Sequence, residues 1–344
     1  MDKKRVLITG ASGFIGKNCA KEFIKRGWKV VSLIHKKVPE EFKKFRKNNE
    51  MDLIYGDIES REGLIAVLEH YVNKKQIKAV VHCAGRASDI GHNREFQKTN
   101  YNGLKNIVEC LERFSIDKLI FISTTDVYGI KDFENADETE ALENNLKNPY
   151  PEYKIKAEAY IRSKLQKNRY VIIRPAAVWG PDDRTILPRV IKYLNSSPFI
   201  IHFGKWRGQN RWPLAYIENV SRMIYLAVKD EDALGESFNI IDREKTGIDE
   251  YYRMIIDIFI PKRSNIKSVT LPFILGWFAG TISSLISNIF NMMYPIYEPS
   301  FYGLFSVSKN LDFSSKKMED IFQKNNENIV TRKQAVLLMK QHCV

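Results

Sequence analysis

Short apolar runs alternate with helical patterns along the first half of the chain. The runs expected to form strands cover residues 6–9, 29–34, 53–55, 79–83, 118–123 and 170–174. Between them, apolar positions recur every three or four residues, which predicts helices over 14–26, 60–72, 101–114 and 150–166. Continuous Val, Ile and Leu runs are typical of parallel strands covered on both faces. The alternation therefore predicts an α/β protein with a doubly wound, mostly parallel sheet.

The pattern changes after residue 175. Prolines interrupt the following segment, one more strand at 237–241 is expected to rejoin the sheet, and the remainder is mainly helical. We therefore divide the chain into residues 1–175 and a smaller, mainly helical portion, 176–344, of which 212–245 returns to the sheet. Because no clear linker separates the two parts, the C-terminal portion is expected to pack on the sheet.

Residues 268–297 contain no charged side chain. The run reaches the roughly 20 apolar residues of a membrane-spanning helix, but serines and asparagines interrupt it. These polar residues fall largely on one helical face, which favours an amphipathic helix. Three interpretations stay open: peripheral contact of residues 269–297 with a membrane, a cover over an apolar substrate pocket, or a buried helix pair.

Composition narrows the class of protein. Hydrophobic residues make up 44% and charged residues 28% of the 344 residues, as in ordinary globular proteins. The net charge of +13 favours anionic partners, but a lysine-rich surface explains it without nucleic acid, and we expect none. Four cysteines without a CxxC pair, and an N-terminus that runs directly into the first strand, indicate a cytoplasmic protein. The histidines are too scattered to predict a metal site.

A glycine-rich turn follows the first strand. In Gly10-Ala-Ser-Gly13-Phe-Ile-Gly16, the first glycine allows a tight turn, the second a close approach to a pyrophosphate, and the third close helix–strand packing. The N-terminus of the next helix offers N–H groups to phosphates. This context predicts a Rossmann dinucleotide site. Its candidate residues here are Gly10, Ser12, Gly13, Phe14, Ile15 and Gly16.

The end of the second strand indicates which dinucleotide binds. NAD sites usually hold Asp or Glu there, on the ribose hydroxyls. In this chain Ile34 is followed by His35, Lys36 and Lys37. A basic cluster attracts a 2′-phosphate that a carboxylate would repel, so we predict NADP(H) in preference to NAD(H), with His35 and Lys36 as contacts.

Other candidate cofactor residues follow the third and fourth strands. Asp57, with Ile58 beside it, can accept a hydrogen bond from the adenine amine. Cys83, Ala84 and Gly85 are small residues where bulk would clash with the cofactor.

Candidate catalytic residues lie at the start of the 150–166 helix. Tyr150 and Lys154 are four residues apart and share one helical face. A neighbouring ammonium is expected to lower the pKa of a phenol, so that Tyr150 can exchange a proton with a carbonyl oxygen. The fifth strand ends in Ser123-Thr124-Thr125, where a hydroxyl can bond both substrate and phenol. The combination predicts an oxidoreductase that interconverts an alcohol and a ketone.

Over residues 4–245 the chain resembles the extended short-chain dehydrogenases, the NAD-dependent epimerase/dehydratase superfamily. The segments that carry the resemblance are Gly10–Gly16, Asp57, His82–Gly85, Thr99–Gly103, Ser123-Thr124 with Val127–Gly129, Tyr150 with Lys154, and Arg174-Pro175 with Val178–Pro181. The resemblance implies catalytic Thr124, Tyr150 and Lys154, and a cofactor site that includes Ser123, Asn100, Pro175 and Val178. It also makes a homodimer an expectation.

Within the superfamily, the chain is most similar to 3β-hydroxysteroid dehydrogenase-like members. This similarity rests on Leu271-Pro-Phe before an apolar helix and on Gly180-Pro-Asp-Asp183, and it implies an apolar, steroid-, lipid- or polyketide-like substrate. The C-terminal close typical of these members is replaced by Ile321-Phe-Gln-Lys-Asn325.

Two other functions stay open. A nucleotide-sugar epimerase or dehydratase would recycle NAD, and Lys205, Arg207 and Arg211 could hold its diphosphate. The pair Thr125-Asp126 does not fit the Asp-Glu pair expected of a dehydratase. A non-enzymatic dinucleotide-binding protein would not need an intact Thr124, Tyr150 and Lys154.

Overall fold

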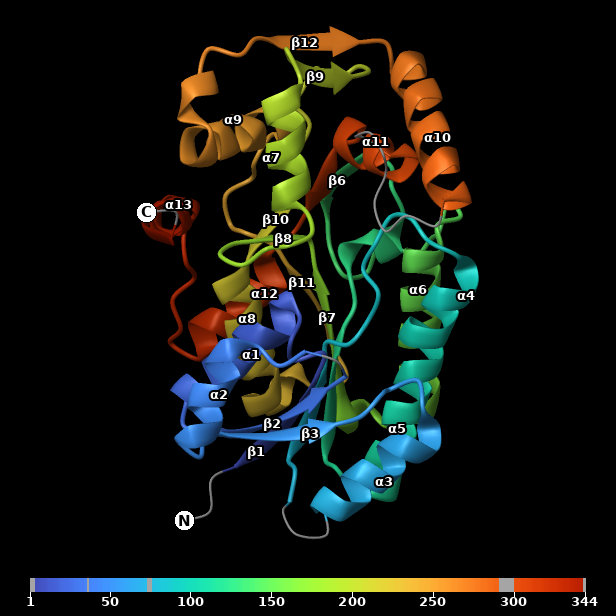
Figure 1. The fold of residues 1–344 in the computed structure, drawn as a ribbon, viewed down its shortest axis with the longest axis vertical. Helices are drawn as coiled ribbons and strands as arrows, with labels where there is room; N and C mark the ends of the chain where they lie inside the picture. Colours follow the sequence, from blue (N-terminus) through green and yellow to red (C-terminus); the bar gives the residue numbers. More distant parts are fainter. Residues whose placement is uncertain (1–3, 36, 73–75, 291–299, 343–344) are drawn as a thin grey trace.

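The computed structural model describes residues 4–35, 37–72, 76–290 and 300–342. Its central sheet has seven parallel strands in the order β11–β7–β5–β4–β1–β2–β3 (Figure 1). The strands are β1 (Arg5–Thr9), β2 (Lys29–Ile34), β3 (Met51–Tyr55), β4 (Ala79–His82), β5 (Lys118–Ile122), β7 (Tyr170–Pro175) and β11 (Ser237–Ile240). The doubly wound parallel sheet expected from the sequence is confirmed, including the return of β11, which pairs with β7.

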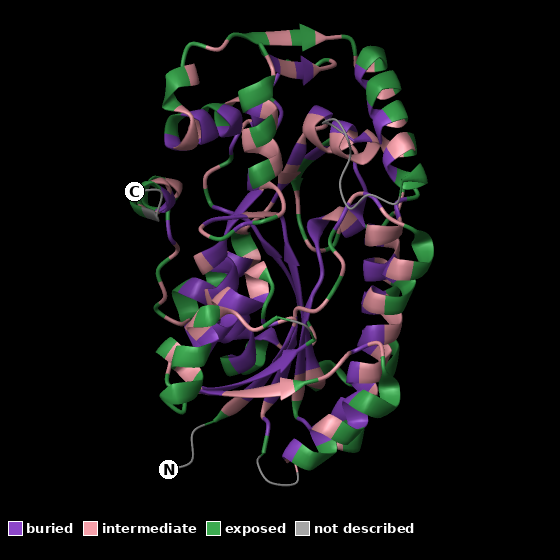
Figure 2. Ribbon diagram, in the orientation of Figure 1, coloured by how far each residue is buried: buried purple, intermediate pink, exposed green. Residues whose placement is uncertain are grey.

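Helices cover both faces of this sheet. Successive residues of β1 alternate between the two cores, since Val6 and Ile8 belong to one hydrophobic cluster and Leu7 to the other. The first cluster includes side chains of α1 (Phe14–Lys25), α2 (Glu40–Lys47), α8 (Ile217–Lys229) and α12 (Lys316–Lys324). The second includes side chains of α3 (Arg61–Val72), α5 (Gly103–Arg113) and α6 (Pro149–Lys164). The strands are buried between these layers (Figure 2).

The helix expected over 101–114 begins differently. A π-helical segment, Gln97–Asn102, follows α4 (Asn93–Phe96) and leads into α5. Such segments occur often at functional sites because they reorient a side chain within a continuous helix. Here the segment carries Asn100, which is 1% exposed.

A second group of elements lies beyond the carboxyl ends of the strands (Figure 1). Among the described residues it comprises three two-stranded parallel pairs and five helices, all from the C-terminal portion except β6. The pairs are β8 (Ala177–Trp179) with β10 (Leu214–Tyr216), β9 (Ile200–Phe203) with β12 (Ser268–Leu271), and β6 (Phe133–Ala136) with β13 (Leu311–Phe313). The helices are α7 (Leu187–Ser196), α9 (Ile248–Phe259), α10 (Phe273–Ile289), α11 (Phe301–Ser308) and α13 (Arg332–His342).

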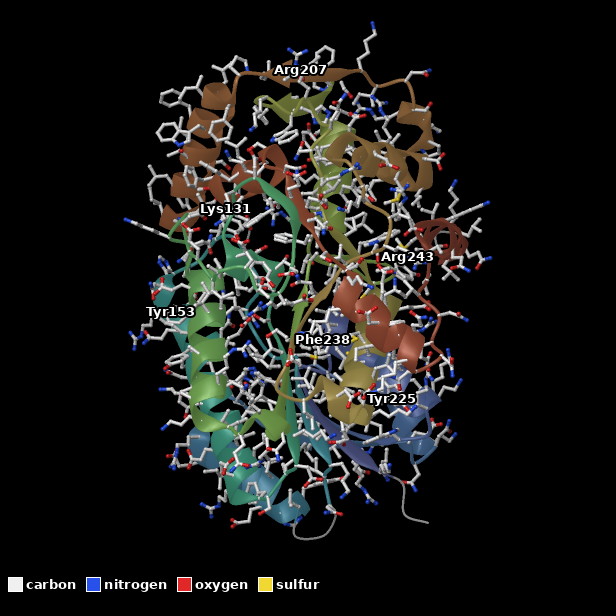
Figure 3. The ribbon with its side chains drawn as sticks, turned by 180° about the vertical axis from the view of Figure 1, so that it is seen from behind. Lys131, Tyr153, Arg207, Tyr225, Phe238 and Arg243 are labelled. Atoms are coloured by element: carbon white, nitrogen blue, oxygen red, sulfur yellow. The ribbon has the colours of Figure 1, made fainter. Side chains whose placement is uncertain are left out.

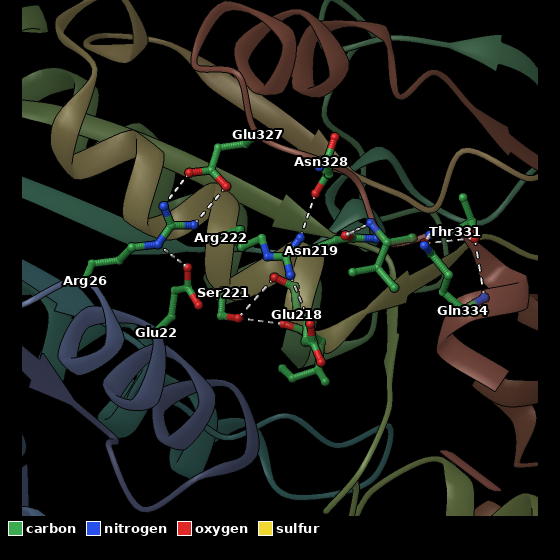
Figure 4. A network of polar contacts seen from close by, with 12 residues as sticks. Glu22, Arg26, Glu218, Asn219, Ser221, Arg222, Glu327, Asn328, Thr331 and Gln334 are labelled. Atoms are coloured by element: carbon green, nitrogen blue, oxygen red, sulfur yellow. Dashed lines mark hydrogen bonds and ion pairs between the residues drawn. The ribbon is translucent and has the colours of Figure 1, made fainter. Parts of the chain in front are cut away.

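A polar network fastens the chain after α12 to the Rossmann layer (Figure 4). Arg26 on α1 donates two hydrogen bonds to the Glu327 carboxylate. Buried Asn219 on α8 accepts from the Val330 amide at 2.8 Å and donates to the Val330 carbonyl at 3.0 Å. The expectation that the C-terminal portion packs against the sheet is confirmed.

Helix α10 packs with its small residues inward. Gly276, Gly280, Ser283 and Ser287 are its buried residues. A Cβ added at Gly280 would lie 3.2 Å from the backbone of Phe301, so glycine permits the close approach of α10 to α11. The amphipathic pattern expected from the sequence is present, but the apolar side chains point outward, which rules out a buried helix pair over 273–290. Residues 291–297 of the uncharged run lie outside the described residues.

Within the described residues, no helix combines the length and apolar character needed to cross a membrane. Nor do three or more His, Cys, Asp or Glu side chains there gather in a way that could hold a metal ion.

Candidate functional site

The glycine-rich turn between β1 and α1 has the shape that a dinucleotide phosphate requires. Gly10 adopts a φ of +62°, and a Cβ there would lie 2.6 Å from the Ala84 nitrogen. A Cβ at Gly16 would lie 2.3 Å from the Gly10 carbonyl oxygen. Gly13 caps α1 without a side-chain hydrogen bond, and the first turn of α1 carries no acidic residue. With neither a capping side chain nor an acidic residue in its first turn, this helix end suits a phosphate group.

The candidate residues for the adenosine end lie after β2 and β3. His35 is exposed, with its Nε2 3.6 Å from Asp57 Oδ2. Asp57 Oδ1 also accepts a hydrogen bond from the Glu59 amide at 2.9 Å, which orients the carboxylate at the end of its strand. Ile58 is buried against Gly103. Lys36 lies outside the described residues.

The segment after β4 contacts Lys154 of α6 at Gly85. A Cβ on Gly85 would lie 3.2 Å from Asn100 Oδ1 and 3.5 Å from Lys154 Nζ. Asn100 accepts from the Arg86 amide at 2.6 Å and donates to the Arg86 carbonyl at 2.9 Å. Asn100 thus holds the main chain of this segment in place, which is how it shapes the site.

Tyr150 lies at the start of α6 and next to Thr124. Asn148 caps the helix by accepting a hydrogen bond from the Tyr150 amide at 2.9 Å, which fixes where the catalytic turn begins. Burial, with the nearby Asp126 carboxyl, raises the pKa of Tyr150 above its ordinary value, and the Thr124 hydroxyl opposes the rise. The phenol is therefore protonated near neutral pH.

Lys154 has a different partner from the one expected. Its Nζ donates to the Ile122 carbonyl at 2.6 Å and lies 4.8 Å from the centre of the Phe121 ring. Burial lowers the pKa of Lys154 to about 8. The expectation that Lys154 lowers the pKa of Tyr150 is wrong for this structure, because desolvation of the phenol dominates and the ammonium lies on the strand end instead.

Two side chains near Thr124, Tyr302 and Asp126, were not predicted as site residues from the sequence. Asp126 is the second residue of the turn Thr125–Tyr128 and is partly accessible. Tyr302 from α11 lies against it. Burial raises the pKa of Asp126 to about 6, with Asp89 adding to the rise and Tyr302 opposing it. The only signal for Asp126 was its position two residues after Thr124. No motif marks Tyr302.

A buried ion pair lies directly beneath Thr124. Arg174 and Glu158 are 2% and 0% exposed, and two guanidinium nitrogens donate to the carboxylate at 3.0 and 2.5 Å. Ser123 donates to the same carboxylate at 2.6 Å. The Ser123 hydroxyl is therefore engaged within the protein, and its place in the cofactor site stays a prediction. The same holds for Pro175, which ends β7, and for Val178, which pairs with Ala215.

A pH-dependent stability is expected from Asp126. The pKa of this carboxyl rises from 3.8 to about 6 on folding. As the pH increases, Asp126 therefore loses its proton at a lower pH in the unfolded chain than in the folded protein. The penalty on the folded state grows from about pH 4 to pH 6 and is constant above that range. We expect Asp126→Asn to raise the free energy of unfolding by about 1–3 kcal/mol at pH 8 and to leave it unchanged at pH 4, as measured by urea unfolding.

Asp137→Asn is the matched control. The Thr139 hydroxyl and amide lower the pKa of Asp137, so this carboxylate stabilises the fold above pH 4 and its loss should have the opposite sign. A lower stability of Asp126→Asn at pH 8 would show that Asp126 is not held in a desolvated site.

Comparison with known proteins places this site in a family. The model of the NAD dependent epimerase/dehydratase family matches residues 6–240, and the chain belongs to that family. The resemblance stated from the motifs, and with it an enzyme of the extended short-chain type, is thereby confirmed at the level of the family.

Individual relatives agree with the nearer resemblance. The chain is 27% identical over 252 residues to the human sterol-4-alpha-carboxylate 3-dehydrogenase, decarboxylating, covering 70% of this chain and 63% of that protein. It is 24% identical over 274 residues to the 3-beta-hydroxysteroid dehydrogenase of Mycolicibacterium neoaurum, covering 77% and 73%. The fold matches dTDP-glucose 4,6-dehydratase from Bacillus anthracis in complex with NAD, with a TM-score of 0.71, 19% identity and coverage of 98% and 96%.

Two of the three basic residues considered for a sugar diphosphate, Lys205 and Arg211, have partners within the protein. Lys205 Nζ lies 2.7 Å from Asp132 and is 71% exposed. Arg211 donates to the Lys245 carbonyl at 3.2 Å. Arg207 lies at the outer end of the molecule, beside β9 and β12 (Figure 3). The structure brings Thr124, Tyr150, Lys154, Asn100 and Gly85 together. A diphosphate role for the three basic side chains stays a prediction.

Proposed function

We propose that the protein is an NADP(H)-dependent oxidoreductase that interconverts a ketone and a secondary alcohol on an apolar substrate. The observation that carries the proposal is a partly buried Tyr150 whose phenol lies beside Thr124, at the carboxyl end of β5 and at the same edge of the sheet as the glycine-rich turn after β1. Bound NADPH would supply the hydride. The protonated phenol favours reduction of the ketone as the direction that the site supports best.

Each side chain has a role in this proposal. Tyr150 gives its proton to the carbonyl oxygen, and Thr124 orients that oxygen through its hydroxyl. Lys154, held between Ile122 and Gly85, presents its ammonium beside the cofactor site. It can restore the proton balance of the phenol, since its pKa of about 8 lies near the working pH.

Two observations support an apolar substrate: the aromatic residues of α11 and the names of two relatives. Above Asp126, α11 supplies Tyr302, flanked in the chain by Phe301 and followed by Phe305, and the two phenylalanine rings lie 5.1 Å apart. The names of the two relatives describe enzymes of sterols and hydroxysteroids. An aromatic cover and these relatives together favour a lipid-like substrate over a sugar nucleotide.

The preference for NADP(H) is tested by fluorescence titration of purified protein with NADPH and NADH. We expect tighter binding of NADPH, and at least a tenfold rise in its Kd for His35→Asp, because a carboxylate there repels the 2′-phosphate. The affinity for NADH should stay the same. Lys43→Asp, on the exposed face of α2, controls for the change in overall charge. Tightly retained NAD in the purified protein would contradict the proposal and favour a sugar-nucleotide epimerase.

The remaining expectations are proposals as well. We propose that residues 176–344 form the substrate-binding portion and that the protein works in the cytoplasm. A homodimer rests on the family resemblance and is checked by light scattering of the purified protein.

A further inference from the structure

One face of α10 exposes a continuous apolar stripe. The stripe consists of side chains that are each more than half exposed and recur every three or four residues: Ile274 53%, Leu275 53%, Phe278 55%, Ile282 57%, Leu285 60%, Ile289 69% and Phe290 72%. It follows the outward side of the helix at the edge of the molecule (Figure 2). Soluble proteins rarely expose an apolar patch of this kind without a partner for it.

The stripe is a consequence of how α10 is anchored. Its small residues make the contact with α11, where Ser284 Oγ accepts a hydrogen bond from the Phe301 amide at 2.8 Å. The Trp277 and Phe301 rings lie 6.5 Å apart, and Phe273 meets Phe305 at 5.1 Å. Because glycine and serine occupy the inner face, the bulky residues are left outside. Rotating the helix to bury them would force bulk into the Gly276 and Gly280 positions, which have no room for a Cβ.

The chain that leads into α10 carries basic side chains. Residues 258–297 contain Lys262, Arg263 and Lys267 and no acidic residue. Lys262 and Lys267 are exposed and precede β12, which leads into α10. Arg207 follows β9, the partner strand of β12, while the neighbouring Lys205 is paired with Asp132 at 2.7 Å. Gly204, at the end of β9, lies next to Phe273 on α10. An apolar helix face with a basic flank complements an anionic lipid surface.

A protein partner fits the stripe less well. Protein interfaces carry roughly one hydrogen bond per 100–200 Å², and a polar rim. Along 274–290, Asn288 is the one exposed side chain that can donate or accept a hydrogen bond. The α10 helix is also too short to span a bilayer, since its 17 residues rise about 25 Å.

We propose that the α10 stripe docks the protein on the surface of an anionic membrane, with the helix lying in the interface and its basic flank on the lipid headgroups. The docked face is the outer side of the α10–α11 pair, whose inner side carries Tyr302 to Asp126. A membrane-bound protein would thus hold its substrate-binding portion against the bilayer. This surface is independent of the chemistry proposed for the site.

The test is co-sedimentation of the full chain with vesicles of phosphatidylcholine alone and of equal parts phosphatidylcholine and phosphatidylglycerol. We expect binding to the mixed vesicles, weaker binding to phosphatidylcholine alone, and a decrease with added salt. The variant Phe278→Asp with Leu285→Asp should bind mixed vesicles at least tenfold more weakly. Leu337→Asp, at a site 55% exposed on α13, is the matched control and should bind like the wild type.

The stripe variant should bind NADPH with the same affinity as the wild type. This control checks that its fold and its cofactor site are intact. Lys262→Glu with Lys267→Glu should lose the preference for anionic vesicles. The proposal is overturned if the wild type stays in the supernatant with both vesicles, or if the stripe variant sediments like the wild type. It is also overturned if the stripe variant only converts a lipid-free dimer into a monomer, because the stripe would then face a second copy. If the wild-type protein bound the mixed vesicles but reduced none of the ketones tested, only the proposed oxidoreductase function would be contradicted.

Discussion

Replacement of Tyr150 by phenylalanine is expected to lower kcat by about 10²–10⁴-fold, the usual contribution of a positioned general acid. The change removes one oxygen from a side chain whose hydroxyl is desolvated and next to Thr124. Since hydride arrival at a ketone carbon leaves negative charge on the oxygen, a missing proton donor raises the barrier directly. The measurement is the oxidation of NADPH, followed by its absorbance, with a panel of apolar ketones.

Tyr153→Phe is the matched control for this experiment. Tyr153 lies on the same helix, three residues on, and its hydroxyl donates to Asn93 rather than toward Thr124. This variant should retain most of the activity. Binding of NADPH should be unchanged in both variants, which separates chemistry from cofactor affinity. A Tyr150→Phe variant with wild-type kcat would show that Tyr150 is not the general acid.

The strands and the phosphate turn could be predicted because their signals are local. Each buried strand is a short Val, Ile and Leu run, and Gly10 and Gly16 stand where a Cβ would collide with the neighbouring backbone. Neither feature depends on distant parts of the chain. The same is true of Tyr150 and Lys154, which one helical turn brings to the same face.

Other parts of the site depend on contacts between distant segments. Tyr302 reaches Asp126 from a helix 176 positions further along the chain, and no spacing rule connects the two residues. The sign of the pKa shift at Tyr150 was also out of reach, because desolvation depends on burial in the folded state. The sequence pattern showed that α10 is amphipathic, but only the packing of Gly276 and Gly280 on α11 shows which face is outside.

The largest effect on stability is expected from Glu158→Ala. This change leaves the Arg174 guanidinium, 2% exposed, without the carboxylate that accepts two of its hydrogen bonds. Breaking a buried ion pair by removing one partner costs about 3–5 kcal/mol, because an uncompensated charge remains in the interior. Urea unfolding at pH 7 should show this loss. Glu152→Ala, which removes an exposed pair with Lys156 on the same helix, should change stability by less than about 0.5 kcal/mol.

The single variant Glu158→Ala combines two losses of stability: the loss of the ion pair and the burial of an unpaired guanidinium. The double replacement Glu158→Leu with Arg174→Leu separates them. If the loss arises mainly from the stranded guanidinium, removing both charges should recover much of it, since apolar groups of similar volume can replace a buried pair at little cost. Arg174 also donates to the Tyr128 hydroxyl at 2.7 Å, and that hydroxyl donates to Asn239 on β11, so recovery should be incomplete. A double variant as unstable as Glu158→Ala would show that the pair itself, through Ser123 and Tyr128, holds β5, β7 and α6 together beneath Thr124.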